Sequence, residues 1–297
     1  MAGPIVYLNG AFVPAEAASV SVFDRGFLYG DSVFETVRAY GGKAFAVGEH
    51  YERLAGSASR IGMALPFERT GFARILAELL AENGLDNAML RFTVSRGVGP
   101  APVPDPAGCE SPTVVVLPRP VPPWDREAWR AGIATVISPV PATPPEVLDP
   151  AAKTGNFLSH IMAIAHARSH GAREAILLDA KGNVAEGAAS NLFGVWNGAL
   201  TTPPADGAIL PGVTRALVLQ VAREEGITCR EEAISPYLLG RADELFVTNT
   251  GWEVMPVAAV NGRPIGDGRA GPVAERLLAA YRRLVARRLG VTAPGDA

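Results

Sequence analysis

The chain has 297 residues, of which 48% are hydrophobic and 19% are charged, and its formal net charge at pH 7 is −3. This composition is that of a globular protein long enough for two domains, and the absence of a basic excess argues against nucleic-acid binding. Cys109 and Cys229 are too few for a disulfide framework and too isolated for a zinc site. The sequence holds no apolar run of about 18 residues and no leader-like first segment, so we expect a cytoplasmic protein without a membrane span.

Turn dipeptides between β-type runs predict hairpins near both ends of the chain. The dipeptides are Asn9-Gly10, Gly41-Gly42, Asn197-Gly198 and Asn261-Gly262. Such pairs accept the positive φ that a two-residue hairpin turn requires. We therefore expect antiparallel sheet in both halves of the chain.

Apolar residues at helical spacing predict helices between these sheets. The three stripes are Tyr51, Leu54, Ala58 and Ile61; Phe72, Ile75, Leu76, Leu79 and Leu80; and Phe157, Ile161 and Ile164. The order of elements is mixed and lacks the regular strand–helix alternation of a doubly wound sheet. The four histidines fall on helical patterns without carboxylates at ligand spacing, so no metal is predicted.

Prolines mark the domain boundary. The run from Leu117 to Pro123 is predicted to be neither a central strand nor a helix. We place an N-terminal domain at residues 1–120, a linker at 121–132 and a C-terminal domain at 133–297. A second proline-rich run, residues 139–145, precedes Lys153 and is predicted to be an ordered loop.

Lys153 is one of three lysines in a chain with 24 arginines. Rarity alone proves little, because most lysines are solvated. Glu186 follows downstream, and an amine with a separate carboxylate suits pyridoxal phosphate. The amine forms a Schiff base with the cofactor aldehyde, and the carboxylate keeps the pyridine nitrogen protonated.

Three segments offer donors for a phosphate group. Arg53 lies beside the first helical stripe and has a fork of N–H donors, although a solvated arginine is an equal alternative. Pro211-Gly212-Val213-Thr214 precedes a helical pattern, so it is either an anion site at a helix N-terminus or a plain Thr cap. Thr248-Asn249-Thr250-Gly251 ends a strand, where hydroxyls and a glycine amide could complete the cradle.

Together these segments resemble the fold-type IV pyridoxal-phosphate enzymes, which include branched-chain aminotransferases, D-amino-acid aminotransferases and aminodeoxychorismate lyases. The matching residues are Asp24-Arg25-Gly26, Tyr29-Gly30-Asp31-Ser32-Val33-Phe34-Glu35, Arg53-Leu54, Lys153, Asn156, Glu186-Gly187, Ser190-Asn191-Leu192-Phe193, Pro211-Gly212-Val213-Thr214-Arg215, and Thr250 before Glu253-Val254. The resemblance implies an α+β fold with a smaller N-terminal α/β sandwich domain. It also implies a larger C-terminal cofactor-binding domain, built around a β-barrel-like sheet with flanking helices, and a homodimer.

The resemblance also assigns roles to residues. Lys153 would be the Schiff-base lysine and would move the proton. The residues that would hold pyridoxal 5′-phosphate are Arg53, Lys153, Glu186, Ser190, Asn191, Val213, Thr214, Thr250 and Gly251. Those that would meet the substrate are Tyr29, Phe34, Arg38, Arg91, Arg96 and Trp252.

The substrate branch is a separate question. The positions that look equivalent to the Tyr, Arg and His of D-amino-acid aminotransferases carry Phe34, Ala101 and Val103 here, which favours a branched-chain L-amino acid with a 2-oxo acid acceptor. Asn156 and the segment from Ser95 to Gly97 look more like the other branches. A D-amino-acid or (R)-amine transaminase, an aminodeoxychorismate lyase and a non-enzymatic cofactor carrier therefore remain alternatives, and the conformation of residues 97–112 is left open.

Overall fold

The computed structural model describes residues 3–109, 111–205 and 209–293. The chain divides into two compact units, the first made of Met1–Pro122, Ala152–Asn156 and Leu289–Thr292, and the second of Pro123–Ala151, Phe157–Arg288 and Ala293–Ala297. The sequence analysis placed Lys153 in the C-terminal domain, whereas its segment groups with the first unit. Residues expected to form a linker include the helix α4 (Arg126–Ala131).

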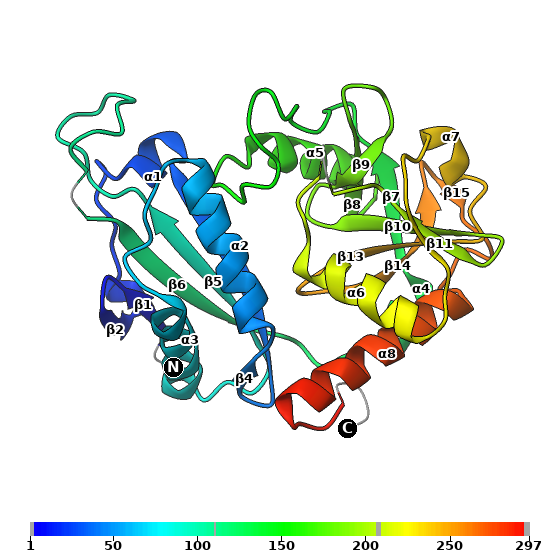
Figure 1. The fold of residues 1–297 in the computed structure, drawn as a ribbon, viewed down its shortest axis with the longest axis horizontal. Helices are drawn as coiled ribbons and strands as arrows, with labels where there is room; N and C mark the ends of the chain where they lie inside the picture. The colour runs from blue at the N-terminus through cyan, green and yellow to red at the C-terminus, as the bar shows by residue number, and fades with distance from the viewer. Residues whose placement is uncertain (1–2, 110, 206–208, 294–297) are drawn as a thin grey trace. The chain divides into compact units, whose positions relative to one another are not determined.

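The first unit contains an antiparallel sheet of order β2-β1-β6-β5-β3-β4, covered by helices (Figure 1). Its strands are β1 (Ile5–Leu8), β2 (Ala11–Pro14), β3 (Ser32–Tyr40), β4 (Lys43–Ala44), β5 (Ala88–Ser95) and β6 (Thr113–Pro120). Its helices are the 3-10 turn η1 (Ala15–Ala17), α1 (Arg25–Tyr29), α2 (Val47–Arg60) and α3 (Arg69–Asn83). Leu54 of α2, Phe72 of α3 and Phe92 of β5 belong to one buried cluster, so the first two predicted helical stripes face a core.

The first part of the proline run lies in strand β6, and the prediction that it is not a central strand is confirmed. Strand β6 continues through Pro118 and Pro120, which pair with Leu90 and Ala88 of β5. Its other neighbour, β1, pairs only with Val115 and Val116. The prolines therefore occupy the part of β6 that has a single neighbour, where a missing N–H removes no bond to β1.

The second unit is built on a mixed sheet of order β12-β11-β10-β13-β14-β7-β8-β9, with β15 pairing β14 (Figure 1). Its strands are β7 (Ile133–Ile137), β8 (Glu174–Leu178), β9 (Val184–Gly187), β10 (Asn191–Trp196), β11 (Ala199–Thr202), β12 (Cys229–Glu231), β13 (Glu244–Asn249), β14 (Glu253–Val260) and β15 (Arg263–Pro264). Its helices besides α4 are α5 (Leu158–Ser169), α6 (Val213–Glu224), α7 (Pro236–Leu239) and α8 (Pro272–Leu289). In the described ranges, no helix is both long and apolar enough to cross a membrane.

Helix α5 forms where a helix was predicted, and the predicted buried face is confirmed only at Ile164. Ile164 is partly buried against a cluster that includes Ala163, Ala167 and Leu177 of β8. Phe157 lies just before the helix, and Ile161 is exposed. The small side chains of Ala163 and Ala167 let the helix axis approach the sheet closely.

The predicted hairpin turns are confirmed. Asn9 and Gly10 both have positive φ between β1 and β2, as do Asn197 and Gly198 between β10 and β11. The turns between β3 and β4 and between β14 and β15 show the same pattern. This conformation matches the right-handed twist of the flanking strands. The expectation of a mixed α and β fold is confirmed as well.

Candidate active site

The segment around Lys153 is fixed along strand β3 by backbone hydrogen bonds. The amide of Phe34 donates to the carbonyl of Lys153 at 2.9 Å, and the amide of Gly155 donates to the carbonyl of Ser32 at 2.8 Å. The amide of Lys153 in turn donates to Oγ of Ser57 at 3.0 Å. A Cβ at Gly155 would lie 2.2 Å from Oγ of Ser32, so only glycine allows this close approach. The backbone of Lys153 is thus held from both sides.

Phe34 brings two of the predicted site residues together. Its side chain is 4% exposed. Nζ of Lys153 lies 4.4 Å from the centroid of the Phe34 ring, and Cζ of Arg91 lies 3.8 Å from the same centroid. Desolvation lowers the pKa of Arg91. The ring therefore gathers an amine and a guanidinium at one place on the β3–β5 sheet.

Arg53 contacts a carboxylate that the sequence analysis did not assign to the site. Its Nε and Nη2 donate to Oε1 and Oε2 of Glu35 at 2.6 and 2.8 Å, and Nδ1 of His50 lies 2.7 Å from Oε2. Glu35 is fully buried. Burial alone would raise its pKa, but the charges of Arg53 and His50 outweigh burial and hold the pKa of Glu35 well below its ordinary value.

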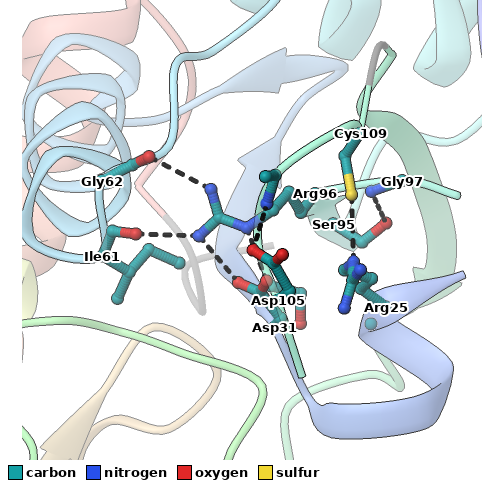
Figure 2. Close-up of polar contacts among 12 residues, drawn as sticks. Arg25, Asp31, Ile61, Gly62, Ser95, Arg96, Gly97, Asp105 and Cys109 are labelled. Atoms are coloured by element: carbon teal, nitrogen blue, oxygen red, sulfur yellow. Dashed lines mark hydrogen bonds and ion pairs between the residues drawn. The ribbon is translucent and has the colours of Figure 1, made fainter. Parts of the chain in front are cut away.

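Arg96 is occupied by structural contacts. It forms a bidentate ion pair with Asp31, at 2.5 and 3.0 Å, and donates to the carbonyls of Ile61 and Gly62 at 2.8 and 3.1 Å (Figure 2). These contacts use Nε and both terminal nitrogens. We therefore do not carry Arg96 forward as an anchor for the substrate carboxylate.

Two other predicted substrate residues, Tyr29 and Arg38, take part in cation–ring contacts of their own. Tyr29 ends α1, and the guanidinium carbon of Arg25 lies 5.9 Å from the centroid of its ring. Arg38 of β3 has its guanidinium carbon 4.8 Å from the centroid of the Tyr40 ring. Their place in a substrate site stays a prediction.

Glu186, in the short strand β9, is a buried carboxylate oriented by neutral donors. Its Oε2 accepts from Nδ2 of Asn191 at 3.0 Å and from the amide of Leu210 at 3.2 Å. Nδ2 of Asn191 also donates to the carbonyl of Leu210 at 3.0 Å. The predicted pair Glu186 and Asn191 is thus in direct contact, and these two neutral donors help to orient the carboxylate.

A second buried glutamate, Glu174, was missed by sequence reasoning. The hydroxyl of Ser190 donates to its Oε2 at 2.9 Å, and the amides of Ala189 and Ala175 donate at 3.2 and 2.9 Å. Burial raises the pKa of Glu174, and these hydrogen bonds only partly offset that effect. Ser190, expected to touch a cofactor, is therefore engaged in the turn before Asn191.

Helix α6 begins without a side-chain cap. Its N-cap is Gly212 and not a threonine, and Val213 and Thr214 form the first turn, both buried. The first backbone N–H groups of a helix that lacks a capping side chain can donate to an anion. A Cβ at Gly212 would lie 1.9 Å from Oδ1 of Asn191, so the glycine lets the helix start approach the residue that orients Glu186.

Asn249 organises the turn between β13 and β14. The sequence analysis named this segment but gave the Asn249 side chain no role. Its Oδ1 accepts from the amides of Gly251 and Trp252 at 3.0 and 2.7 Å, and its Nδ2 donates to the carbonyl of Ala189 at 3.0 Å. Thr250 lies in this turn, half-buried. Trp252 is partly buried against the core of the second unit, and its observed role is in packing.

Thr248 lies near this turn and has a buried hydroxyl. Its side chain is 1% exposed, and its Oγ1 has no hydrogen-bond partner within the described part of the chain. Thr248 pairs across the ladder with Asn191 of β10. A buried hydroxyl without a partner beside the Glu186 contacts is expected where a ligand completes the site.

Comparison with known proteins identifies the family. The family model described as "Amino-transferase class IV" matches residues 32–260. The chain belongs to the class IV aminotransferase family. The match covers both Lys153 and Glu186, and the structures of other members carry the same fold. The expectation of a fold-type IV enzyme is thereby confirmed.

Relatives within the class IV aminotransferases cover nearly the whole chain. A Methanocaldococcus jannaschii protein named "Putative branched-chain-amino-acid aminotransferase" is 42% identical over 92% of this chain and 93% of its own length. The D-alanine aminotransferase of Staphylococcus haemolyticus is 32% identical over 95% and 98%. The T.th. branched-chain amino acid aminotransferase, solved with pyridoxamine 5′-phosphate, has a TM-score of 0.91 at 35% identity over 97% and 95%.

Proposed function

We propose that this class IV aminotransferase uses pyridoxal 5′-phosphate to move an amino group between a branched-chain L-amino acid and a 2-oxo acid. The observation that carries the proposal is the meeting of Lys153 and Arg91 at the Phe34 ring, at 4.4 and 3.8 Å from its centroid. A lysine amine can move a proton, and an arginine guanidinium can hold a carboxylate.

The chain's polar groups fit the proposed cofactor. When bound, pyridoxal phosphate supplies an aldehyde that joins covalently to an amine and a ring that withdraws electrons. Lys153 would provide the amine, and the buried Glu186 would accept a hydrogen bond from the ring nitrogen. The uncapped start of α6, with Thr214, would donate to the phosphate. The hydroxyl of Thr248, which has no partner among the described residues, supports an added acceptor or donor in that region.

Arg53 would contribute to the phosphate contacts while it remains paired with Glu35. The carboxylate engages Nε and Nη2 and thereby fixes the plane of the guanidinium. A neutral Glu35–Arg53 pair alone attracts a dianion weakly. His50, next to Oε2 of Glu35, offsets part of the carboxylate charge when it is protonated.

Lys153 would act as the base. In its neutral form the amine is a base, and it lies 4.4 Å from the centroid of the Phe34 ring. The neutral amine could then take the proton from the substrate Cα and return a proton on the way to the products. The backbone contacts of Lys153 with Phe34 and Ser57 keep its Cα in place during these transfers.

The substrate assignment rests on the surroundings of the α-carboxylate. Arg91 would hold this carboxylate, and Phe34 would present an apolar surface beside it. Ala101 and Val103 stand where the resemblance expects the Arg and His of D-amino-acid aminotransferases. The names of the Methanocaldococcus jannaschii and T.th. relatives support the branched-chain choice.

A half-reaction panel tests the proposal. Purified protein with added cofactor is mixed with L-leucine, L-valine, D-alanine, (R)-1-phenylethylamine or aminodeoxychorismate, and the cofactor's visible absorbance is followed. We expect rapid bleaching by L-leucine and L-valine. Bleaching by D-alanine or the (R)-amine alone would overturn the substrate while leaving the cofactor, and pyruvate release from aminodeoxychorismate would instead identify a lyase.

Lysine variants test the base and distinguish an enzyme from a carrier. Lys153→Ala is expected to abolish bleaching and covalent attachment of the cofactor. Lys181→Ala, at an exposed lysine in the turn after β8, is the matched control and is expected to retain both. Borohydride reduction followed by peptide mass mapping locates the attachment. Label at another residue, or full activity of Lys153→Ala, would refute the assignment.

We further propose that the protein is a cytoplasmic homodimer. Both described cysteines are free, which suits a reducing compartment. Phe23 and Phe27 around α1 are exposed, as are Leu158, Ile161 and Met162 of α5. Each unit thus exposes large apolar side chains, which are typical of surfaces that a second copy covers. Light scattering after size exclusion is expected to give twice the chain mass of 31.1 kDa.

A further inference from the structure

The loop between β5 and β6 is anchored on a buried arginine that forms no ion pair with any described carboxylate. Arg25, the first residue of α1, is 2% exposed. Its Nε donates to Sγ of Cys109 at 3.0 Å (Figure 2), and its Nη1 donates to the carbonyl of Val103. Its Nη2 is buried without a hydrogen-bond partner among the described residues. A buried N–H donor without an acceptor is unfavourable, so an added acceptor beside Nη2 would complete the site.

No described carboxylate accepts a hydrogen bond from the Arg25 side chain. Asp24, the preceding residue, accepts hydrogen bonds from a backbone amide and two hydroxyls. Asp31 pairs with Arg96, as Figure 2 shows. Asp105, in the same loop as Cys109, accepts through Oδ1 from a backbone amide at 2.9 Å. The sulfur of Cys109 is therefore the described side-chain atom that accepts from the Arg25 guanidinium.

The two cysteines of the chain contrast sharply. The 3.0 Å from Nε of Arg25 to Sγ of Cys109 falls within the range of an N–H···O bond, although sulfur is the larger atom, so this sulfur is a strong acceptor. Sγ of Cys229 instead donates to the carbonyl of Ile227 at 3.3 Å, and burial raises the pKa of Cys229. Both residues are half-buried. Exposure is thus similar, and the hydrogen-bond environment differs.

We propose that Cys109 is an oxidation-sensitive cysteine beside the guanidinium of Arg25, and that hydrogen peroxide oxidises it to a sulfenic acid held by the same guanidinium. The thiol first loses its proton to solvent. The sulfur attacks one peroxide oxygen, and an S–O bond forms as the O–O bond breaks. Sulfur loses two electrons, the peroxide gains them, and the departing hydroxide is protonated by solvent. Nη2 of Arg25 then donates to the new oxygen, which gives this nitrogen the acceptor that it lacks.

Alkylation kinetics test the reactivity of Cys109, with Cys229 as the internal control. Unmodified protein is labelled with iodoacetamide at about pH 6.5, where ordinary thiols react slowly and thiolates react quickly. Peptide mass mapping gives the rate at each cysteine. Cys109 is expected to react about tenfold faster than Cys229 or more. Equal rates at the two cysteines would overturn the proposal.

Two variants separate the charge of Arg25 from its position. Arg25→Gln removes the cation and is expected to slow labelling of Cys109 to the rate of Cys229. Gly99→Ala keeps the cation, but its Cβ would lie 2.5 Å from Nη2 and 2.7 Å from Nε, so the guanidinium must move away. It is expected to slow Cys109 as well, which keeps the test valid if Arg25→Gln does not fold. Unchanged labelling in Gly99→Ala would contradict the role of Arg25 in the reactivity of Cys109.

The oxidation of Cys109 is measured by trapping its product. Protein carrying Cys229→Ser is treated with hydrogen peroxide and then with dimedone, which traps sulfenic acids, and the adduct is mapped by mass. We expect an adduct at Cys109 in this protein and a weaker one when Gly99→Ala is added. A mapped Cys109 without adduct, after peroxide has been consumed by the protein, would refute the sulfenic acid.

Discussion

Arg53 donates two parallel hydrogen bonds to Glu35, at 2.6 and 2.8 Å. The arginine proposed for the phosphate is therefore positioned by a carboxylate that is itself fully buried. Arg53 lies on α2 and Glu35 on β3. The pair therefore couples the helix to the strand that also carries Phe34 and holds the Lys153 segment. Fork-to-fork geometry fixes the guanidinium plane, which a single hydrogen bond would not do.

Glu35→Gln is expected to destabilise the protein by about 3–5 kcal/mol at neutral pH, because it leaves the cation of Arg53 without its buried partner. The folded-state pKa of Glu35 lies below its ordinary value of 4.5. Its stabilising contribution is therefore present above 4.5 and is lost as pH falls through the folded pKa. Urea unfolding of wild type and variant as a function of pH measures this, and the two curves should converge in acid.

The control for this prediction is Glu52→Gln, an exposed glutamate on the same helix. It is expected to change stability by less than about 0.5 kcal/mol. Glu35→Gln should also release the cofactor more readily, since Arg53 loses its orientation. Equal cofactor retention in wild type and Glu35→Gln would argue that Arg53 does not contact the phosphate.

Glu174→Gln is expected to disturb the turn that leads from Glu186 to Asn191. Both oxygens of Glu174 accept hydrogen bonds, and an amide group in place of one oxygen would face N–H and O–H donors. We expect a loss of about 1–3 kcal/mol in the free energy of unfolding. Turnover should also fall, because Glu186 depends on the geometry of this turn, whereas Glu146→Gln at an exposed site should leave both unchanged.

The pH dependence at Glu174 has the opposite sign to that at Glu35. Burial raises the pKa of Glu174 in the folded protein above 4.5, so the fold binds this proton more tightly than the unfolded chain does. The contribution of Glu174 to stability is fully present below 4.5 and is lost as pH rises through the folded pKa. The difference between wild type and Glu174→Gln should therefore narrow as pH rises. A difference that widens with pH would contradict the direction of the shift.

Gly212→Ala is expected to weaken cofactor binding without unfolding the protein. The added Cβ would lie 1.9 Å from Oδ1 of Asn191, so the start of α6 or the amide of Asn191 must shift. Either shift alters the contacts proposed for the phosphate and for Glu186. Gly240→Ala, whose Cβ would meet nothing within 4 Å, is the matched control. Cofactor titration is expected to show a Kd about tenfold or more higher for Gly212→Ala alone.

Arg91→Met tests the proposed carboxylate contact. Loss of a charge-assisted hydrogen bond of about 1.5–3 kcal/mol should lower kcat/KM for L-leucine by roughly 10- to 150-fold. The reaction of an amine that lacks a carboxylate should change little. Arg119→Met, an exposed arginine on the neighbouring strand β6, should leave both substrates unaffected. Equal losses for the two substrates would indicate a general disturbance of Phe34 and Lys153 instead.

Local chemistry made part of this molecule predictable from its sequence. An Asn-Gly or Gly-Gly pair accepts positive φ wherever it stands, so the hairpin at Asn9-Gly10 required no knowledge of distant residues. The helical stripes on α2 and α3 were also readable, because each repeats within one segment. The pairing of Lys153 with Glu186 as site residues followed from residue types and resemblance, and Asn191 was named with them.

Only the tertiary structure determines which buried polar side chains contact one another. Glu35 is 18 positions from Arg53, and Cys109 is 84 positions from Arg25, so nothing in the intervening sequence announces either contact. The same limit hid the contacts of Glu174 and the outward face of α5. A buried charge must find a partner wherever packing places one, and packing depends on the volumes and contacts of the whole unit. Turn geometry is set within a few residues, whereas the environment that gives a side chain its chemistry is assembled from distant parts of the chain.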